Sequence, residues 1–274
     1  MTMARFGMNP AGSGELPYVE SDGVPRVLAC LPPRPGSGGL PKWSASQPTL
    51  PRSQWRAVSY ARPDLPVLDQ GPYGSCVGHG ACSGFTLAWL LGGGTFHRLS
   101  SCFLYGLING GRDAGAVVSD AMTTLEATGI CLEDEVPEGM IYRSRFPVSA
   151  FDTARRFRLS MAYHCRTFDE IGSALQLGFI PVYGIQVGPD FGQLDEEGVA
   201  PVGGRGGHCL FGRGMKLSRQ GEWLIETQNS WGERFGLHGA CYLREAHFGD
   251  DCDAFAIQAT CEDPQETDLP PSIG

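Results

Sequence analysis

The order of apolar and polar residues divides the chain into a helix-patterned first half and a strand-patterned second half. Apolar and small residues fill positions 76–91 and stop at the glycines 92–94, which predicts a buried helix. Further helices are expected over residues 100–108, 117–127 and 167–177. Short β-type runs between Gly-rich turns predict strands over residues 179–187, 209–212, 222–228, 240–243 and 254–260. This order of elements is typical of an α+β fold.

The two ends of the chain differ in pattern from its middle. Residues 1–50 are rich in Pro and Gly and show little periodicity, so they predict an irregular arm rather than a domain. Residues 262–274 contain acidic but no basic residues and predict an acidic tail. Residues 51–261 remain as one domain. The whole chain of 274 residues, 42% of them hydrophobic, suffices for one large or two modest cores.

Charge and hydropathy exclude some classes of protein. The net charge is −9, and the basic residues of the first 62 positions are scattered, which favours a solvated arm over one that binds nucleic acid. No run of about eighteen apolar residues occurs, so no membrane span is predicted. The first ten residues lack the continuous apolar segment of a secretion signal, and we expect a protein made without one.

The ten cysteines could form disulfides or a zinc site. No Cys-x-x-Cys pair occurs, so we expect neither a metal nor another cofactor. Most of the cysteines lie in apolar or small-residue stretches, where a reduced cysteine behaves as a small hydrophobe. Reduced, buried thiols are therefore expected at Cys82, Cys102, Cys209 and Cys241.

Four other residues have the types that a thiol-dependent reaction needs. A thiol nucleophile requires a base, a group that orients the base, and donors for the oxyanion that forms. Cys76, His208, Asn229 and Gln70 supply these parts, and His208 and Asn229 follow Cys76 by 132 and 153 residues. Each of the four alone has a commoner structural explanation, but together at this spacing they predict a catalytic site.

The fragments that carry these residues resemble the papain family of cysteine peptidases. The likeness extends over residues 50–260 and includes Gly74-Ser75-Cys76, Gly207-His208 and Asn229-Ser230-Trp231-Gly232. Three positions depart from the family pattern. Val77 replaces an aromatic residue, Tyr73 replaces a disulfide-forming cysteine, and Gly115 is the single glycine where the family has a pair.

The resemblance implies a papain-like fold with two lobes. A helical lobe contains the central nucleophile helix, a second lobe contains an antiparallel sheet or barrel, and the active-site cleft lies between them. Cys76 would lie on one wall of the cleft and His208 on the other. Cleft residues implied by the resemblance, apart from the catalytic ones, are Gly115, Ala116, Gly207 and the shielding Trp231.

The same resemblance implies how the site residues act. The helix N-terminus and a His208 imidazolium would make Cys76 a thiolate at neutral pH. Asn229 would orient the ring of His208, and Gln70 would form the oxyanion hole with the backbone N–H of Cys76. His79 lies three residues after Cys76, but the family places a buried aromatic residue there, so His79 is assigned to the core.

We therefore expect a cysteine-type peptidase that hydrolyses a peptide or protein substrate through an acyl-enzyme intermediate. The alternative is a non-catalytic component of a larger assembly, for example a virion, held through the N-terminal arm. The expected location is the cytoplasm or such a phage- or virion-type assembly. Cell-wall amidases and transglutaminases also place Cys before His, but they are not expected to show Asn-Ser-Trp-Gly.

The arm of residues 1–50 is too short and too rich in Pro and Gly to be the long helical prosegment of secreted papain relatives. Its few large apolar side chains predict that it docks on the domain or on a partner. These side chains are Leu28, Leu31, Leu40 and Trp43. We expect the docked arm to leave Cys76 accessible in the full-length protein.

Overall fold

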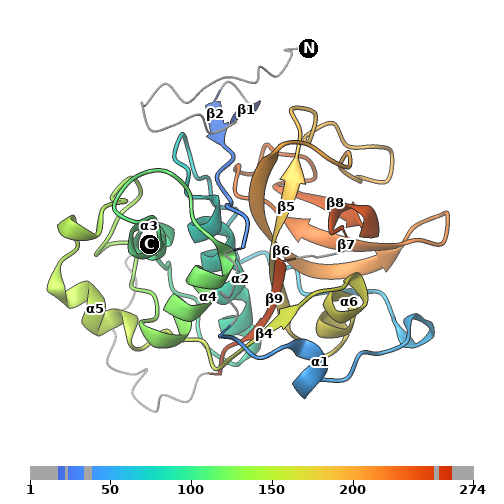
Figure 1. Ribbon diagram of the computed structural model, residues 1–274, viewed down its shortest axis with the longest axis horizontal. Coiled ribbons are helices and arrows are strands. Elements are labelled where there is room, and N and C mark those ends of the chain that lie inside the picture. Colours follow the sequence, from blue (N-terminus) through green and yellow to red (C-terminus); the bar gives the residue numbers. More distant parts are fainter. Residues whose placement is uncertain (1–17, 22–23, 34–38, 250–252, 261–274) are drawn as a thin grey trace.

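The computed structural model describes residues 18–21, 24–33, 39–249 and 253–260. It shows helices on one side and most of the strands on the other, with the chain after β2 running down between them (Figure 1). The α-helices are α1 (Trp43–Ser46), α2 (Cys76–Leu91), α3 (Ser101–Ile108), α4 (Val118–Ala127), α5 (Val148–Ala154) and α6 (Phe168–Gln176). The strands are β1 (Tyr18–Ser21), β2 (Val24–Val27), β3 (Val58–Ser59), β4 (Met161–Cys165), β5 (Ile180–Val187), β6 (Gly206–Leu217), β7 (Trp223–Gln228), β8 (Ala240–Arg244) and β9 (Asp253–Gln258).

Helix α2 forms the centre of the helical half. All of its residues except the last are buried, which explains its apolar composition on every side. A Cβ on Gly78 would lie 2.6 Å from the carbonyl oxygen of Ser101, and a Cβ on Gly84 would lie 2.7 Å from the side chain of Val182. The glycines of α2 therefore let α3 and β5 approach its backbone, at a cost in helix propensity.

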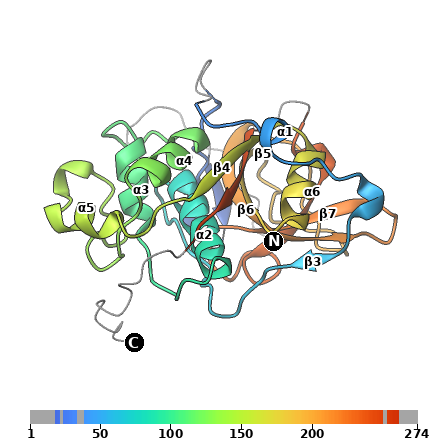
Figure 2. The same cartoon turned by 90° about the horizontal axis from the view of Figure 1, so that it is seen from below.

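Seven strands form one antiparallel sheet in the order β4-β9-β5-β6-β7-β8, with β3 paired to β6. Strand β6 lies beside β5 and β7 and aligns His208 with Ile185. Its pairing with β7 shifts between Gly212 and Gly214, where a bulge interrupts the register. Helix α2 packs against strands β5, β6 and β9, and Figure 2 shows it beside the sheet.

Two hydrophobic cores lie on opposite faces of the sheet. One core joins α2, α3 and α4 to the sheet and includes Phe85, Phe103 and Leu125. The other lies under α6 and includes Trp55 and Phe168. Helix α6 starts at Thr167, whose side chain accepts a hydrogen bond from the backbone N–H of Glu170, as an N-cap residue should.

The predicted α+β class is confirmed, and the main helices begin and end within a residue of the expected positions. The expected strand 209–212 is too short, because β6 extends over Gly206–Leu217 and its glycines interrupt the apolar pattern. Strands β1, β2 and β3 and helix α1 were not predicted, and β1, β2 and α1 are regular elements within the arm that was expected to be irregular. Helix α5 and strand β4 were not predicted either. Both are short, and β4 alternates exposed, buried and half-buried residues only weakly.

The arm packs against the rest of the chain, as its apolar residues predicted. Leu28 is 1% exposed and Trp43 is fully buried, while Leu31 is half-buried. Residues 1–17 and the acidic tail lie outside the described residues. Among the helices that the structure describes, none is long and apolar enough to cross a membrane.

Candidate active site

Cys76 is the first residue of α2, and Ser75 occupies the N-cap position. The thiol therefore lies where the unpaired N–H groups and the positive end of the helix dipole are concentrated. The preceding loop is held by Asp113, whose Oδ1 accepts hydrogen bonds from the N–H of Gly74 at 2.9 Å and from the hydroxyl of Tyr105 at 2.6 Å. Nothing in the sequence pattern marked Asp113 or Tyr105 for this role.

His208 lies on β6 and is fully buried. Its Nε2 is 2.7 Å from Oδ1 of Asn229, which follows β7 directly. The ring of Trp231 lies over the imidazole, with centroids 4.7 Å apart and planes inclined by 32°. The structure therefore brings the predicted base, its orienting amide and the shielding indole together. The other ring nitrogen, Nδ1, is buried and has no hydrogen-bond partner within the described chain.

Burial favours the uncharged forms of both reactive groups. It raises the pKa of the Cys76 thiol, although backbone N–H groups of Ala29, Cys209, Val77 and Cys76 itself oppose this by donating hydrogen bonds to the sulfur. Burial lowers the pKa of His208 to about 4, and the hydrogen bond that Nε2 donates to Oδ1 of Asn229 opposes this shift. The surroundings thus favour a neutral thiol and a neutral imidazole, and the expected thiolate–imidazolium pair is not their preferred state.

Gln70 is buried and uses all of its amide atoms within the protein. Its Oε1 accepts hydrogen bonds from the hydroxyl of Ser230 and the indole N–H of Trp231, both at 3.1 Å. Its Nε2 donates to the carbonyl oxygens of Tyr73 at 2.9 Å and of Val27 at 3.1 Å. Because Val27 belongs to the arm, Gln70 has no amide hydrogen left for an oxyanion while the arm is in place.

The arm runs through the cleft between the predicted substrate-lining residues. The N–H of Cys30 donates to the carbonyl of Gly207 at 2.9 Å, and residues 29–31 bond to the N–H and carbonyl of Ala116. A Cβ on Gly115 would lie 2.2 Å from the carbonyl oxygen of Ala29. Gly115, Ala116 and Gly207 therefore all border the arm.

This arrangement leaves Cys76 with no exposed surface. The expectation that the full-length chain keeps Cys76 accessible is wrong, because it considered only a long helical prosegment as a block of the cleft, whereas the extended residues 26–33 already border Gly115, Ala116 and Gly207 and the thiol is fully buried. The arm offers the sulfur the N–H of Ala29, which is a donor and not an electrophilic carbonyl carbon. In this register the arm covers the thiol of Cys76.

The arm is also anchored by charge. The guanidinium of Arg26 is 2% exposed and its Nη2 lies 2.8 Å from Oδ2 of Asp69, the residue before Gln70. A buried guanidinium needs such a partner, because taking its charge out of water is costly. The docked arm therefore reaches the loop that leads to Cys76.

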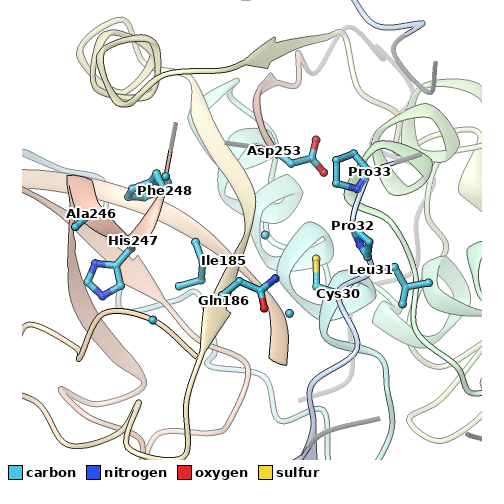
Figure 3. Close-up of a pocket in the computed structure, with 14 residues that line it drawn as sticks. Cys30, Leu31, Pro32, Pro33, Ile185, Gln186, Ala246, His247, Phe248 and Asp253 are labelled. Atoms are coloured by element: carbon cyan, nitrogen blue, oxygen red, sulfur yellow. The ribbon is translucent and has the colours of Figure 1, made fainter. Parts of the chain in front are cut away.

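A cavity of about 340 Å³ opens beside the arm (Figure 3). Arm residues 30–33 form one side, and Gly184, Gln186 and Asp253 contribute to the other. Burial raises the pKa of Asp253 to about 6. The sequence analysis missed Asp253, and the signal that could have found it was an acidic residue at the start of a predicted buried strand.

His79 is a core residue, as expected. It is fully buried, and its ring nitrogens lie 3.0 Å from the carbonyl oxygen of Ser75 and 3.1 Å from the hydroxyl of Ser101. Within the described residues, the cysteines form no disulfide and no group of three or more His, Cys, Asp or Glu residues could hold a metal ion. The thiols of Cys82, Cys102, Cys209 and Cys241 are free and buried, as predicted.

No protein-family model and no curated protein sequence matches the chain. Solved structures do match it. Xylellain, a cysteine protease from Xylella fastidiosa, has a TM-score of 0.67 at 20% identity, over 85% of this chain and 96% of its own. The digestive procathepsin L 3 of the Tenebrio molitor larval midgut has a TM-score of 0.61 at 18% identity, over 80% and 73% of the two chains.

The bromelain protease from Ananas comosus, solved in complex with the E64 inhibitor, has a TM-score of 0.60 at 16% identity. This match covers 76% of the present chain and 99% of the bromelain chain. At such low identities the matches establish the fold alone. The resemblance predicted from the motifs is confirmed at that level, and the chain has the papain-like fold of these cysteine proteases.

Proposed function

We propose that the chain is a cysteine-type peptidase that hydrolyses peptide bonds through Cys76, His208 and Asn229. The observation that carries this proposal is the state of the His208 ring. Its Nε2 is bound to Asn229, while its Nδ1 is buried without a partner in the described chain. An unpaired buried nitrogen costs free energy, and that cost supports a role in proton transfer.

The reaction follows from this arrangement. The Cys76 thiol transfers its proton to Nδ1 of His208, and the thiolate adds to the carbonyl carbon of the substrate. His208 then gives this proton to the leaving amine, and an acyl-thioester remains on Cys76. Water, which loses a proton to His208, attacks the thioester, and the protonated His208 returns the proton to the leaving thiolate. Asn229 stays bound to Nε2 throughout and keeps the ring oriented.

A substrate can reach Cys76 only after the arm has left the cleft. Departure of the arm admits water, which reduces the desolvation that now favours the neutral thiol and imidazole. It also removes the carbonyl of Val27 from Gln70, and this frees one amide hydrogen of Gln70 for the oxyanion. We therefore propose that the arm-docked chain is the latent form of the enzyme.

The test is labelling of the full-length protein with a peptidyl epoxide at pH 6, followed by mass spectrometry of the adduct. We expect the adduct on Cys76 and not on Cys102 or Cys131, because burial, together with the negative charges of Glu138 and Glu135, raises the pKa of both thiols. His208→Ala should slow labelling, and Cys76→Ala should abolish both labelling and peptide hydrolysis. Peptide hydrolysis that persists in Cys76→Ala would refute the proposal.

A further inference from the structure

His79 is a buried ionisable group that takes no part in the reaction proposed above. Its side chain is 1% exposed and lies on α2, three residues after Cys76. Burying an imidazole costs free energy unless its ring nitrogens find partners. Both nitrogens of His79 do find partners, and these partners connect the imidazole to the peptide group that precedes the thiol.

The first partner of the His79 ring is the carbonyl oxygen of Ser75, which lies 3.0 Å from Nδ1. A carbonyl oxygen can only accept a hydrogen bond, so Nδ1 carries a hydrogen and donates it. The backbone N–H of His79 donates to the same oxygen, also at 3.0 Å. The hydroxyl of Ser75 does not cap the helix and has no partner within the described chain. The carbonyl of Ser75 is therefore held by His79 and not by the side chain at the N-cap position.

The second partner of the ring is the carboxylate of Glu138. Its Oε2 lies 3.3 Å from Nε2 of His79, and the hydroxyl of Ser101 lies 3.1 Å from the same nitrogen. A ring with its only hydrogen on Nδ1 would turn the lone pair of Nε2 toward the carboxylate, whereas a doubly protonated ring donates to both acceptors. Burial acts to raise the pKa of Glu138, but the hydrogen bond and the positive charge of His79 outweigh it and lower that pKa. The geometry is thus that of an imidazolium held between a carboxylate and a carbonyl.

The carbonyl of Ser75 and the N–H of Cys76 belong to one peptide group. The group is planar and trans, so the two bonds point in opposite directions, and a donor that fixes the carbonyl also fixes the direction of the N–H. Because Cys76 is the first residue of α2, this N–H has no acceptor within the helix. In the arm-docked chain it serves the sulfur of Cys76 itself. During the proposed reaction it lies where the oxyanion forms, beside the carbon that the sulfur attacks.

We propose that His79, held by Glu138, is a positioning residue that orients and polarises the peptide group between Ser75 and Cys76 as an oxyanion donor. This inference rests on the proposed function. When negative charge develops next to the N–H of Cys76, electron density in the peptide group shifts toward the carbonyl oxygen of Ser75. The hydrogen bond from His79 to that oxygen then becomes stronger, because hydrogen bonds in a chain polarise one another. The bond therefore stabilises the transition state more than the ground state.

The experiment compares two reactions of Cys76 that differ in whether a carbonyl oxyanion forms. Acylation by p-nitrophenyl acetate passes through a tetrahedral oxyanion, whereas alkylation by iodoacetamide displaces iodide at a saturated carbon and forms none. On the full-length protein, acylation is measured as p-nitrophenolate release corrected with Cys76→Ala, and alkylation as the Cys76 adduct in mass spectrometry. Reagent concentrations are kept where both rates rise linearly with concentration. Opening of the arm is then a pre-equilibrium common to both reactions, and it cancels in the ratio of the two rates.

His79→Leu removes the side-chain donor and should lower the acylation rate about 10- to 100-fold, while alkylation stays within about threefold and reports that the variant is folded. His79→Asn places an amide N–H near the position of Nδ1 and should restore part of the lost acylation rate. Glu138→Gln leaves the imidazole in place, changes a side chain that is 43% exposed, and should lower acylation about 3- to 10-fold. The control His97→Leu makes the same exchange toward the other end of α2, where His97 packs on Phe157 and Phe157 on Trp89, and should change neither rate.

Three results would overturn the inference and leave the proposed function intact. One is a loss of acylation and alkylation by the same factor in His79→Leu, which would show that the imidazole only supports packing. The second is an unchanged ratio of the two rates in either His79→Leu or Glu138→Gln. The third is acylation that is no faster in His79→Asn than in His79→Leu. Failure of the proposed function has a different signature, because the parent protein would then acquire no acetyl group on Cys76, and this result would overturn both.

Discussion

Leu28→Ala should release the arm from the cleft and speed the labelling of Cys76. Leu28 is 1% exposed and packs on Gly206, where a Cβ would lie 2.2 Å from Cδ1 of the leucine. Truncation of a buried leucine costs about 2–5 kcal/mol. Because Leu28 enters water when the arm leaves, this cost falls on the docked state and not on the open state.

The lower limit of about 2 kcal/mol corresponds to a roughly 30-fold larger open fraction. If a trap reacts only with the open form, the labelling rate of Cys76 should rise by at least that factor. The assay is the second-order rate of adduct formation by a peptidyl epoxide at pH 6, with the adduct located by mass spectrometry. Leu217→Ala is the matched control, because Leu217 is 52% exposed and lies far along β6 from the cleft.

A labelling rate in Leu28→Ala within twofold of the parent would refute the reasoning, provided that the parent is labelled at Cys76. The trap would then reach the sulfur without displacing the arm. Labelling that rises equally in Leu217→Ala would also contradict it, because a general loss of stability and not arm release would then be responsible.

Three further outcomes are expected. Gly207→Ala should also expel the arm and raise the rate of Cys76 labelling, because the added Cβ would lie 1.9 Å from the backbone oxygen of Cys30. The control is Gly39→Ala, where nothing lies within 4 Å of the added carbon. An unchanged labelling rate in Gly207→Ala would contradict the docking geometry. Asn229→Ala should lower kcat of the opened enzyme about 10- to 150-fold without abolishing turnover, since it removes one hydrogen bond to the imidazolium. Complete loss of turnover would assign Asn229 more than an orienting role. Asp253→Asn should stabilise the protein in urea unfolding by about 3 kcal/mol at pH 7.5, because the pKa of Asp253 is raised to about 6 on folding. The folded state then binds more protons than the unfolded state between about pH 4 and 6, so the parent loses stability as the pH rises through this window. The gain should accordingly shrink at pH 5, and an equal gain at both pH values would contradict the burial of this carboxylate.

Local sequence signals were sufficient for α2, which carries Cys76, and for α6. The limits of α2 agree with the apolar run that ends at three glycines, and Thr167 marks the start of α6 through its capping side chain. The signals were insufficient for β6, because its glycines break the apolar pattern: Gly206 and Gly207 lie against the arm, and Gly214 lies against the backbone of β3. Helix α5 has only seven residues, too few for a periodic pattern to be distinguished.

Within the site, the order and spacing of Cys76, His208, Asn229 and Gln70 along the chain were enough to name them as one group. Their protonation states were not predictable in the same way. The direction of the Cys76 and His208 pKa shifts depends on burial, and the arm that buries them comes from residues 26–33. The sequence analysis considered only the helix dipole and the His208 imidazolium, so it predicted a lowered pKa for Cys76. Burial instead raises this pKa.

The sequence by itself determined the fold class, a candidate catalytic group and the presence of an arm that docks through apolar side chains. Only the tertiary structure decided where the arm docks, that it turns the N–H of Ala29 toward the thiol, and that Asp253 faces a cavity beside it. The physical reason is how far apart along the sequence the interacting residues lie. Helix limits and motif spacing depend on residues that are near in sequence, whereas desolvation, hydrogen bonding of the arm and cavity shape depend on residues such as Cys30, Gly207 and Asp253, which meet only after the chain has folded.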